Sequence, residues 1–198
     1  MPDPFFDLSS KDKYDALQVA ASRSGRSAHL LEKDIWVVWT LSALFDAPFA
    51  PHLVFKGGTS LSKGYQAIER FSEDVDVTYD IRAIVPDLVP ANGDGLPPSR
   101  SQEQRWSKVI RERLEVWVRD TVSPVLIERL QDERITARVT AQADIVQIEY
   151  EPQAEGSGYV RPVVLLEFGA RSTGEPFERR SVTCDAAAHL PELSLIHI

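Results

Sequence analysis

The stretch between Phe55 and Asp80 constrains this chain more than any other part of its sequence. It reads FKGGTSLSKGYQAIERFSEDVDVTYD, with two adjacent glycines and two hydroxyl side chains ahead of two aspartates separated by one valine. The apolar run LVF before the glycines and the alternating run DVDVTY are both typical of β-strands. Between them Leu61, Tyr65 and Ile68 have the i, i+4, i+7 spacing of one helix face. The stretch therefore predicts a strand, a tight turn, a short helix with one apolar face, and a second strand.

The two glycines suggest a binding site for an anion. A strand that ends in glycine lets the backbone approach a ligand with no Cβ in the way, and the amides at the start of the following helix favour negative charge. Hydroxyl side chains directly after the glycines can add hydrogen-bond donors. The alternative is a tight strand-to-helix turn with no ligand. The predicted phosphate cradle comprises Gly57, Gly58, Thr59 and Ser60.

The two aspartates are typical of a metal site. Alternate side chains of a strand share a face, so Asp74 and Asp76 should stand about 7 Å apart, measured along the backbone, while Val75 and Val77 face the core. Two such charges repel unless a cation lies between them, and Mg²⁺ prefers one or two carboxylates completed by water and substrate phosphates. A solvated strand face is the alternative. Joined to the glycine turn, the pair favours metal-assisted phosphoryl or nucleotidyl transfer.

A third carboxylate would hold the second metal ion that such chemistry commonly uses. Glu167 is the best candidate, because it is the only acid in the apolar run VVLLEFGAR. A charge inside a buried strand is costly without a partner or a metal. Glu167 could instead pair with Arg171 or another base.

The rest of the chain predicts an α+β fold with a mixed sheet. Ser9 and Ser27 are placed to open two helices, the second of them apolar around most of its circumference. The proline-rich residues 85–101 predict a mobile surface loop, and Pro124 should kink or end the long helix that follows. Three further strands are predicted, ITARVT, IVQIEY and VVLLEFG, and the last two should form a hairpin. The run RRSVTC could add an edge strand after them.

Composition excludes several classes of protein. The 198 residues are 43% hydrophobic and 26% charged, which suits one globular domain, and no apolar run approaches the roughly 20 residues of a membrane span. With no leader segment visible, we expect a cytoplasmic protein. The single Cys184 excludes an internal disulfide. A net charge of −8 means that an RNA partner would need a local basic patch. The candidate patch, which could equally be a solvated helix face, comprises Arg100, Arg105, Lys108, Arg111 and Arg113.

One family shares these motifs. The run LVFKGGTSLSKGYQAIERFSEDVDV, preceded by EKDIWVVWTLSALF and followed by LLEFGAR, resembles the AbiEii/AbiGii nucleotidyltransferase toxins, which have the DNA polymerase β-like nucleotidyltransferase fold. The resemblance extends from about Leu8 to Leu193. It implies a mixed sheet flanked by helices, with a helical N-terminal segment.

The resemblance also implies roles for particular residues. The glycine turn with Thr59 and Ser60 would cradle a nucleoside triphosphate, while Asp74 and Asp76 would bind Mg²⁺. Ser72 precedes the first aspartate where the family has a serine, and would touch the nucleotide or a water on the metal. Lys63 could pair with a phosphate, or could be a solvated helix lysine.

The biology that the resemblance implies is a toxin of a bacterial type IV toxin–antitoxin system active in phage defence. The acceptor would be tRNA, and an antitoxin of transcriptional-regulator type would be the partner. Two other hypotheses remain open on the residues alone. One is a kinase-like phosphotransferase acting on a protein, and the other is a noncatalytic domain that binds a nucleotide or an antitoxin.

The C-terminal end departs from the family pattern. Members usually continue into a helical region that carries a lysine and then an aspartate, and the sequence ends before such a segment. Its last residues, LSLIHI, are not typical of a natural helix or strand end. We therefore expect residues 1–192 to be an incomplete nucleotidyltransferase domain, residues 193–198 to be a non-native tail, and this chain alone to show little or no activity.

Overall fold

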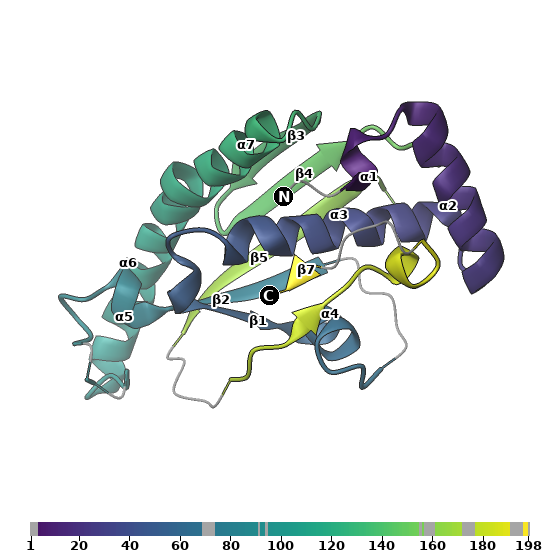
Figure 1. Cartoon of the computed structure of the whole chain (residues 1–198). Coiled ribbons are helices and arrows are strands. Elements are labelled where there is room, and N and C mark those ends of the chain that lie inside the picture. The colour runs from purple at the N-terminus through teal and green to yellow at the C-terminus, as the bar shows by residue number, and fades with distance from the viewer. Residues whose placement is uncertain are drawn as a thin grey trace.

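A five-stranded mixed sheet forms the centre of the structure, a computed structural model that describes residues 4–68, 74–90, 92–93, 95–154, 156, 161–171, 177–190 and 196–197 (Figure 1). The strand order is β1-β2-β5-β4-β3. The pair β2/β5 is parallel, and the pairs β1/β2, β5/β4 and β4/β3 are antiparallel. The predicted α+β fold with a mixed sheet is confirmed. The strands are Leu53–Lys56 (β1), Asp74–Asp80 (β2), Ala137–Gln142 (β3), Ile145–Tyr150 (β4) and Val163–Arg171 (β5).

Helices pack against this sheet, and the two that were predicted to follow Ser9 and Ser27 begin where expected. Ser9 caps the first of them by accepting a hydrogen bond from the Asp12 amide, and Ser27 is the N-cap of the second. The α-helices are Pro4–Asp7 (α1), Ser10–Ser24 (α2), Ala28–Phe45 (α3), Gly57–Lys63 (α4), Ile81–Ile84 (α5), Arg100–Trp117 (α6) and Ser123–Asp132 (α7). Shorter turns are Ala50–His52 (η1), the π-helical Val118–Val122 (η2) and Asp185–Ala188 (η3).

The sheet has one face covered by helices and one polar face. Helix α3 is buried along nearly its whole length, as its apolar circumference predicts. Trp36 of α3 stacks on Tyr150, and Trp117 of α6 contacts both Tyr79 and Phe168, so these helices pack on the same face of the sheet. The residues that alternate with these along β2 and β5, including Asp74, Asp76 and Glu167, therefore project to the opposite face of the sheet.

Helix α4 differs from the prediction. It ends at Lys63 and does not continue through Ile68, and Leu61, Tyr65 and Ile68 are 46%, 49% and 37% exposed. The expected apolar helix face is therefore wrong. Gly64 follows the helix directly. Because glycine is a poor helix former and the apolar side chains stay exposed, the helix does not extend past Lys63.

Two other local predictions need correction, while the predicted interruption of the long helix near Pro124 is confirmed. The run RRSVTC contributes Ser181–Val182 (β6), which pairs with Ile196–His197 (β7) in a separate two-stranded sheet and not at the edge of the main one. Val85 and Val89 in the predicted surface loop are fully buried. Near Pro124 the long helix passes through η2 into α7, with the proline in the first turn of α7, where its missing N–H costs little. The predicted hairpin pairing of β4 with β5 is confirmed.

Among the described residues, no helix combines the length and hydropathy that a membrane span requires. Cys184, the single cysteine, is buried.

Candidate functional site

The strand register aligns three charged residues across the polar face of the sheet. Lys56 of β1 is directly opposite Asp76 of β2, and Asp76 is in turn the neighbour of Glu167 in β5. Residues that pair across adjacent strands project from the same face and have Cβ atoms about 5 Å apart. Sequence analysis predicted the two carboxylates but not Lys56, because the register that aligns β1 with β2 cannot be read from the sequence.

The glycine turn lies directly against this row. Gly57 follows β1 with a φ of +77°, the left-handed region that glycine adopts readily. A Cβ atom built on Gly57 would lie 1.9 Å from Oδ2 of Asp76 and 2.8 Å from its carboxyl carbon. A side chain at this position would therefore require the Asp76 carboxylate or the turn to move. The backbone at the start of α4 and the Asp76 carboxylate therefore face the same small volume.

Thr59 ties α4 to the aspartate strand. Its Oγ1 donates a hydrogen bond of 2.5 Å to the backbone oxygen of Asp74, and the residue is only 2% exposed. The hydroxyl proton of Thr59 is thus used inside the protein, so the predicted extra donor to a phosphate is not free at this position. Ser60 is also buried, at 7% exposure. Ser72, the remaining hydroxyl predicted for the nucleotide, lies outside the described residues.

Lys63 is held in a buried ionic cluster at the other end of α4. Its Nζ lies 2.5 Å from Oδ1 of Asp34 and 2.6 Å from Oδ1 of Asp185, and its side chain is 9% exposed. The expectation of a solvated helix lysine is therefore wrong. In this structure the ammonium is committed to two carboxylates, so we do not place it on a phosphate.

Asp34 is the centre of this cluster. It lies on α3 with 1% exposure, and its Oδ2 accepts a 2.6 Å hydrogen bond from the backbone amide of Asp185. Arg26 pairs with the second oxygen of Asp185 at 2.6 Å. Burial raises the pKa of Asp34 to about 6 from its ordinary 3.8, against the lowering effect of the charge on Lys63. Sequence analysis missed Asp34, whose only signal is an acid inside an apolar helix.

The raised pKa of Asp34 predicts a pH-dependent stability. Because the folded state binds this proton more tightly than the unfolded state, ionisation of Asp34 lowers the free energy of unfolding as pH rises from about 4 to about 6, by about 3 kcal/mol in total. Asp34→Asn removes the titration. We therefore expect its stability relative to the wild type to increase across that window and to level off above it. Urea unfolding of both proteins at pH 4, 5, 6 and 7 measures this difference, and a constant difference would contradict it.

Glu167 stands at the end of the charged row in an acidic neighbourhood. Its pKa is raised by partial desolvation and by the negative charges of Asp76, Asp74 and Asp144. Within the described part of the chain Glu167 forms no ion pair, so the alternative in which Arg171 neutralises it is wrong. Four carboxylates therefore share this corner of the polar face.

The donor chemistry of this corner suits Mg²⁺. The described residues contain no group of three or more His, Cys, Asp or Glu side chains gathered around one point as a complete metal site would be. Mg²⁺ does not require one, since it is commonly held by one or two carboxylates with water and substrate phosphates completing its shell. Asp74 and Asp76 supply such carboxylates, and the metal roles predicted for them and for Glu167 stay predictions.

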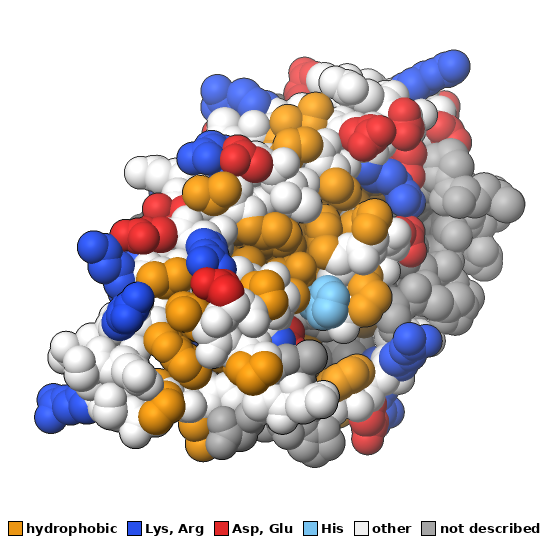
Figure 2. All heavy atoms as spheres, turned by 90° about the vertical axis from the view of Figure 1, so that its left-hand side faces the viewer, with side chains coloured by type: hydrophobic (Ala, Val, Ile, Leu, Met, Phe, Trp, Pro, Cys, Tyr) orange, Lys and Arg blue, Asp and Glu red, His pale blue; other side chains and the backbone are white. Residues whose placement is uncertain are grey.

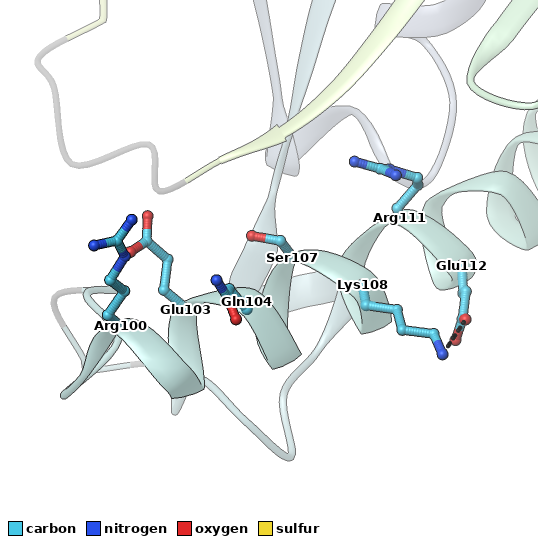
Figure 3. Close-up of a pocket in the computed structure, with 7 residues that line it drawn as sticks. All are labelled: Arg100, Glu103, Gln104, Ser107, Lys108, Arg111 and Glu112. Carbon is cyan, nitrogen blue, oxygen red and sulfur yellow. Dashed lines mark ion pairs between the residues drawn. The ribbon is translucent and has the colours of Figure 1, made fainter.

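A second polar feature lies along α6. A shallow groove of about 690 Å³ runs over the start of this helix (Figure 3). Cations and acids alternate along it: Arg100, Lys108 and Arg111 stand beside Glu103 and Glu112, and Lys108 approaches Glu112 at 3.8 Å. Figure 2 shows the same end of the molecule, with acidic and hydrophobic side chains among the basic ones. The groove lies at the α5 end of the sheet, away from α4 (Figure 1).

The predicted basic patch is thus smaller than its sequence suggests. Arg113 donates hydrogen bonds to both carboxylate oxygens of Asp87 from its two terminal nitrogens, Nη1 and Nη2. In the described structure Arg100, Arg105 and Arg111 have no carboxylate partner. These three residues are the cations left for an external anion on this helix.

Comparison with known proteins identifies the family. A search of curated proteins finds no significant match. The family model described as nucleotidyl transferase AbiEii toxin, type IV TA system, matches residues 39–196, which include the glycine turn, both aspartates and Glu167. That match covers well over half of the chain, and the mixed sheet flanked by helices agrees with a nucleotidyltransferase-like fold. The chain belongs to the AbiEii family of nucleotidyl transferase toxins of type IV toxin–antitoxin systems.

Proposed function

We propose that this protein transfers a nucleotide from a nucleoside triphosphate to a tRNA in a reaction that depends on Mg²⁺. The observation that carries the proposal is the close approach of the Gly57 backbone to the Asp76 carboxylate. It brings a helix start, which favours a phosphate, to the edge of a carboxylate pair, which favours a divalent cation.

The residues of this corner would divide the work. Gly57 and Gly58 would orient the triphosphate through their backbone amides, and Asp74 and Asp76 would hold the cation. Bound Mg²⁺ would supply a Lewis acid that neutralises charge on the phosphoryl oxygens. Glu167, the neighbour of Asp76 across the sheet, would take the proton of the attacking hydroxyl at its Oε atoms. Pyrophosphate is then the leaving group.

Charge decides where an RNA acceptor can bind. The protein carries a net charge of −8, so RNA would be repelled by most of its surface. Arg100, Arg105 and Arg111 on α6 give one region where phosphates could be neutralised. The membership of a toxin–antitoxin family further implies that a cognate antitoxin counteracts the activity of this protein, in a system that we propose acts in phage defence.

The first test is Mg²⁺-dependent nucleotide binding, because it requires only the corner described above. Titration with each of the four nucleoside triphosphates, with Mg²⁺ and with EDTA, should show affinity only in the presence of the metal. Asp76→Asn should weaken that affinity at least tenfold by removing a charged ligand. Asp132→Asn makes the same change on the exposed end of α7 and should have no effect. Equal binding by both variants would refute the metal assignment.

The second test identifies the reaction. The protein encoded at the natural locus is incubated with labelled triphosphates, total tRNA and Mg²⁺. Label in the RNA together with released pyrophosphate supports the proposal. Label on a protein together with a nucleoside diphosphate would instead indicate a kinase-like phosphotransferase. Metal-dependent binding without either product would indicate a noncatalytic nucleotide-binding domain.

A further inference from the structure

Lys56 is the one cation in the charged row on the polar face. It is the last residue of β1, it is the cross-strand partner of Asp76, and Gly57 of the turn follows it directly. Its backbone is extended, with φ of −129° and ψ of −171°, so the strand geometry continues through this residue. Its side chain therefore leaves the sheet on the face that carries Asp76 and Glu167.

The charge of Lys56 is not used within the described structure. No carboxylate oxygen there lies within 4.0 Å of its Nζ, although four acidic side chains occupy the same corner. The contrast is Lys63, seven residues later, whose ammonium has two carboxylate partners. A lysine that served only to neutralise Asp76 would be expected to contact it, because the two residues are directly opposite each other.

The position of Lys56 on an edge strand offers a simpler explanation for a lysine without a carboxylate partner. The experiment must distinguish this explanation from a binding role. β1 is an outer strand of the sheet, and exposed lysines are common on such strands because they discourage pairing with another chain. However, Lys56 is half-buried, and it stands at the junction of the strand with the glycine turn. A triphosphate bound at the turn would therefore lie within reach of the Lys56 ammonium.

We propose that Nζ of Lys56 binds a phosphate oxygen of the nucleoside triphosphate. This inference rests on the proposed function and adds a residue to its substrate site. The triphosphate brings several negative charges to a corner that already holds four carboxylates, and a compact ammonium offsets part of that repulsion. Lys56 would thus take the phosphate contact that the sequence suggested for Lys63.

The test uses inorganic tripolyphosphate as the probe, since it has the phosphates of the substrate without its base or sugar. In the presence of Mg²⁺, Lys56→Met should weaken tripolyphosphate binding at least tenfold, and Lys56→Arg should retain part of the affinity. Lys11→Met removes an exposed lysine from α2 and should bind like the wild type. Unchanged affinity in Lys56→Met would overturn the proposal and leave an edge-strand lysine.

Two further measurements make the result specific. The first is Mn²⁺ binding in the absence of phosphate, measured through the paramagnetic relaxation that the ion causes. This binding should not weaken in Lys56→Met, because a neighbouring positive charge only opposes binding of the metal ion. Equal loss of metal and tripolyphosphate binding would indicate a disturbed site and would contradict the proposal. If the wild-type protein binds tripolyphosphate and Asp76→Asn loses it while Lys56→Met keeps it, then only the role of Lys56 fails. If the wild type does not bind it at all, the proposed function fails first.

Discussion

Gly57→Ala is expected to be strongly destabilising and to abolish metal-dependent nucleotide binding. Two costs combine at this position. A non-glycine residue at φ +77° costs about 1–2 kcal/mol. The new Cβ would also overlap Oδ2 of Asp76, at 1.9 Å, and relieving such an overlap costs about 1–3 kcal/mol more. Because either the turn or the carboxylate must move, we expect nucleotide affinity to fall at least a hundredfold. Urea unfolding and nucleotide titration measure the two effects.

Gly25→Ala is the matched control for this prediction. Gly25 ends α2 with a φ of +73°, nearly the same backbone conformation, and a Cβ there would meet nothing within 4 Å. It should show the backbone cost alone, with unchanged nucleotide binding. If both variants lose the same stability and both still bind nucleotide, then Gly57 does not approach Asp76 as described.

Lys63→Met is expected to lower the free energy of unfolding by about 3–5 kcal/mol at pH 8, the usual cost of leaving one partner of a buried ion pair without the other. The stranded group is Asp34, whose side chain is 2% exposed and has no other cation as close. Urea unfolding measures the loss. The loss should shrink as pH falls, because a protonated Asp34 needs no partner.

A double-mutant cycle separates this ionic effect from lost packing. Adding Asp34→Asn to Lys63→Met removes the stranded charge and should restore part of the stability. Lys11→Met breaks an ion pair with Asp15 in which both side chains are largely exposed, and should cost no more than about 1 kcal/mol. A double variant as unstable as Lys63→Met alone would mean that the methylene packing of Lys63, and not its charge, stabilises the fold.

Local signals predicted much of the fold. The serine cap of α2, the start of α3 after Ser27, the alternation in β2 and the apolar runs of β4 and β5 depend on neighbouring residues, and the structure confirms each of them. The same holds for the turn at Gly57, where a positive φ favours glycine over other residues. Local structure that depends on short spacing could therefore be predicted.

Contacts between distant segments could not be predicted in the same way. Lys63 meets Asp34 only because α4 packs beside α3, and no periodicity encodes that neighbour. Lys56 was missed because its position opposite Asp76 is set by strand register. Helix α4 was predicted too long because Leu61, Tyr65 and Ile68 have helical spacing, yet the described structure leaves them exposed. Spacing alone does not reveal whether an apolar face has a partner.

The position of β5 in the middle of the sheet governs when the acidic row can form during synthesis. β5 lies between β2 and β4, although it is made after both of them and after α6 and α7. Asp76 consequently has no Glu167 beside it until the ribosome has released residue 171. β5, the last strand of the main sheet to be made, must then insert between β2 and β4. Such long-range closure is slow compared with local folding. A nascent chain of this architecture therefore carries α6, α7 and four strands of the sheet before Asp76 and Glu167 can become neighbours.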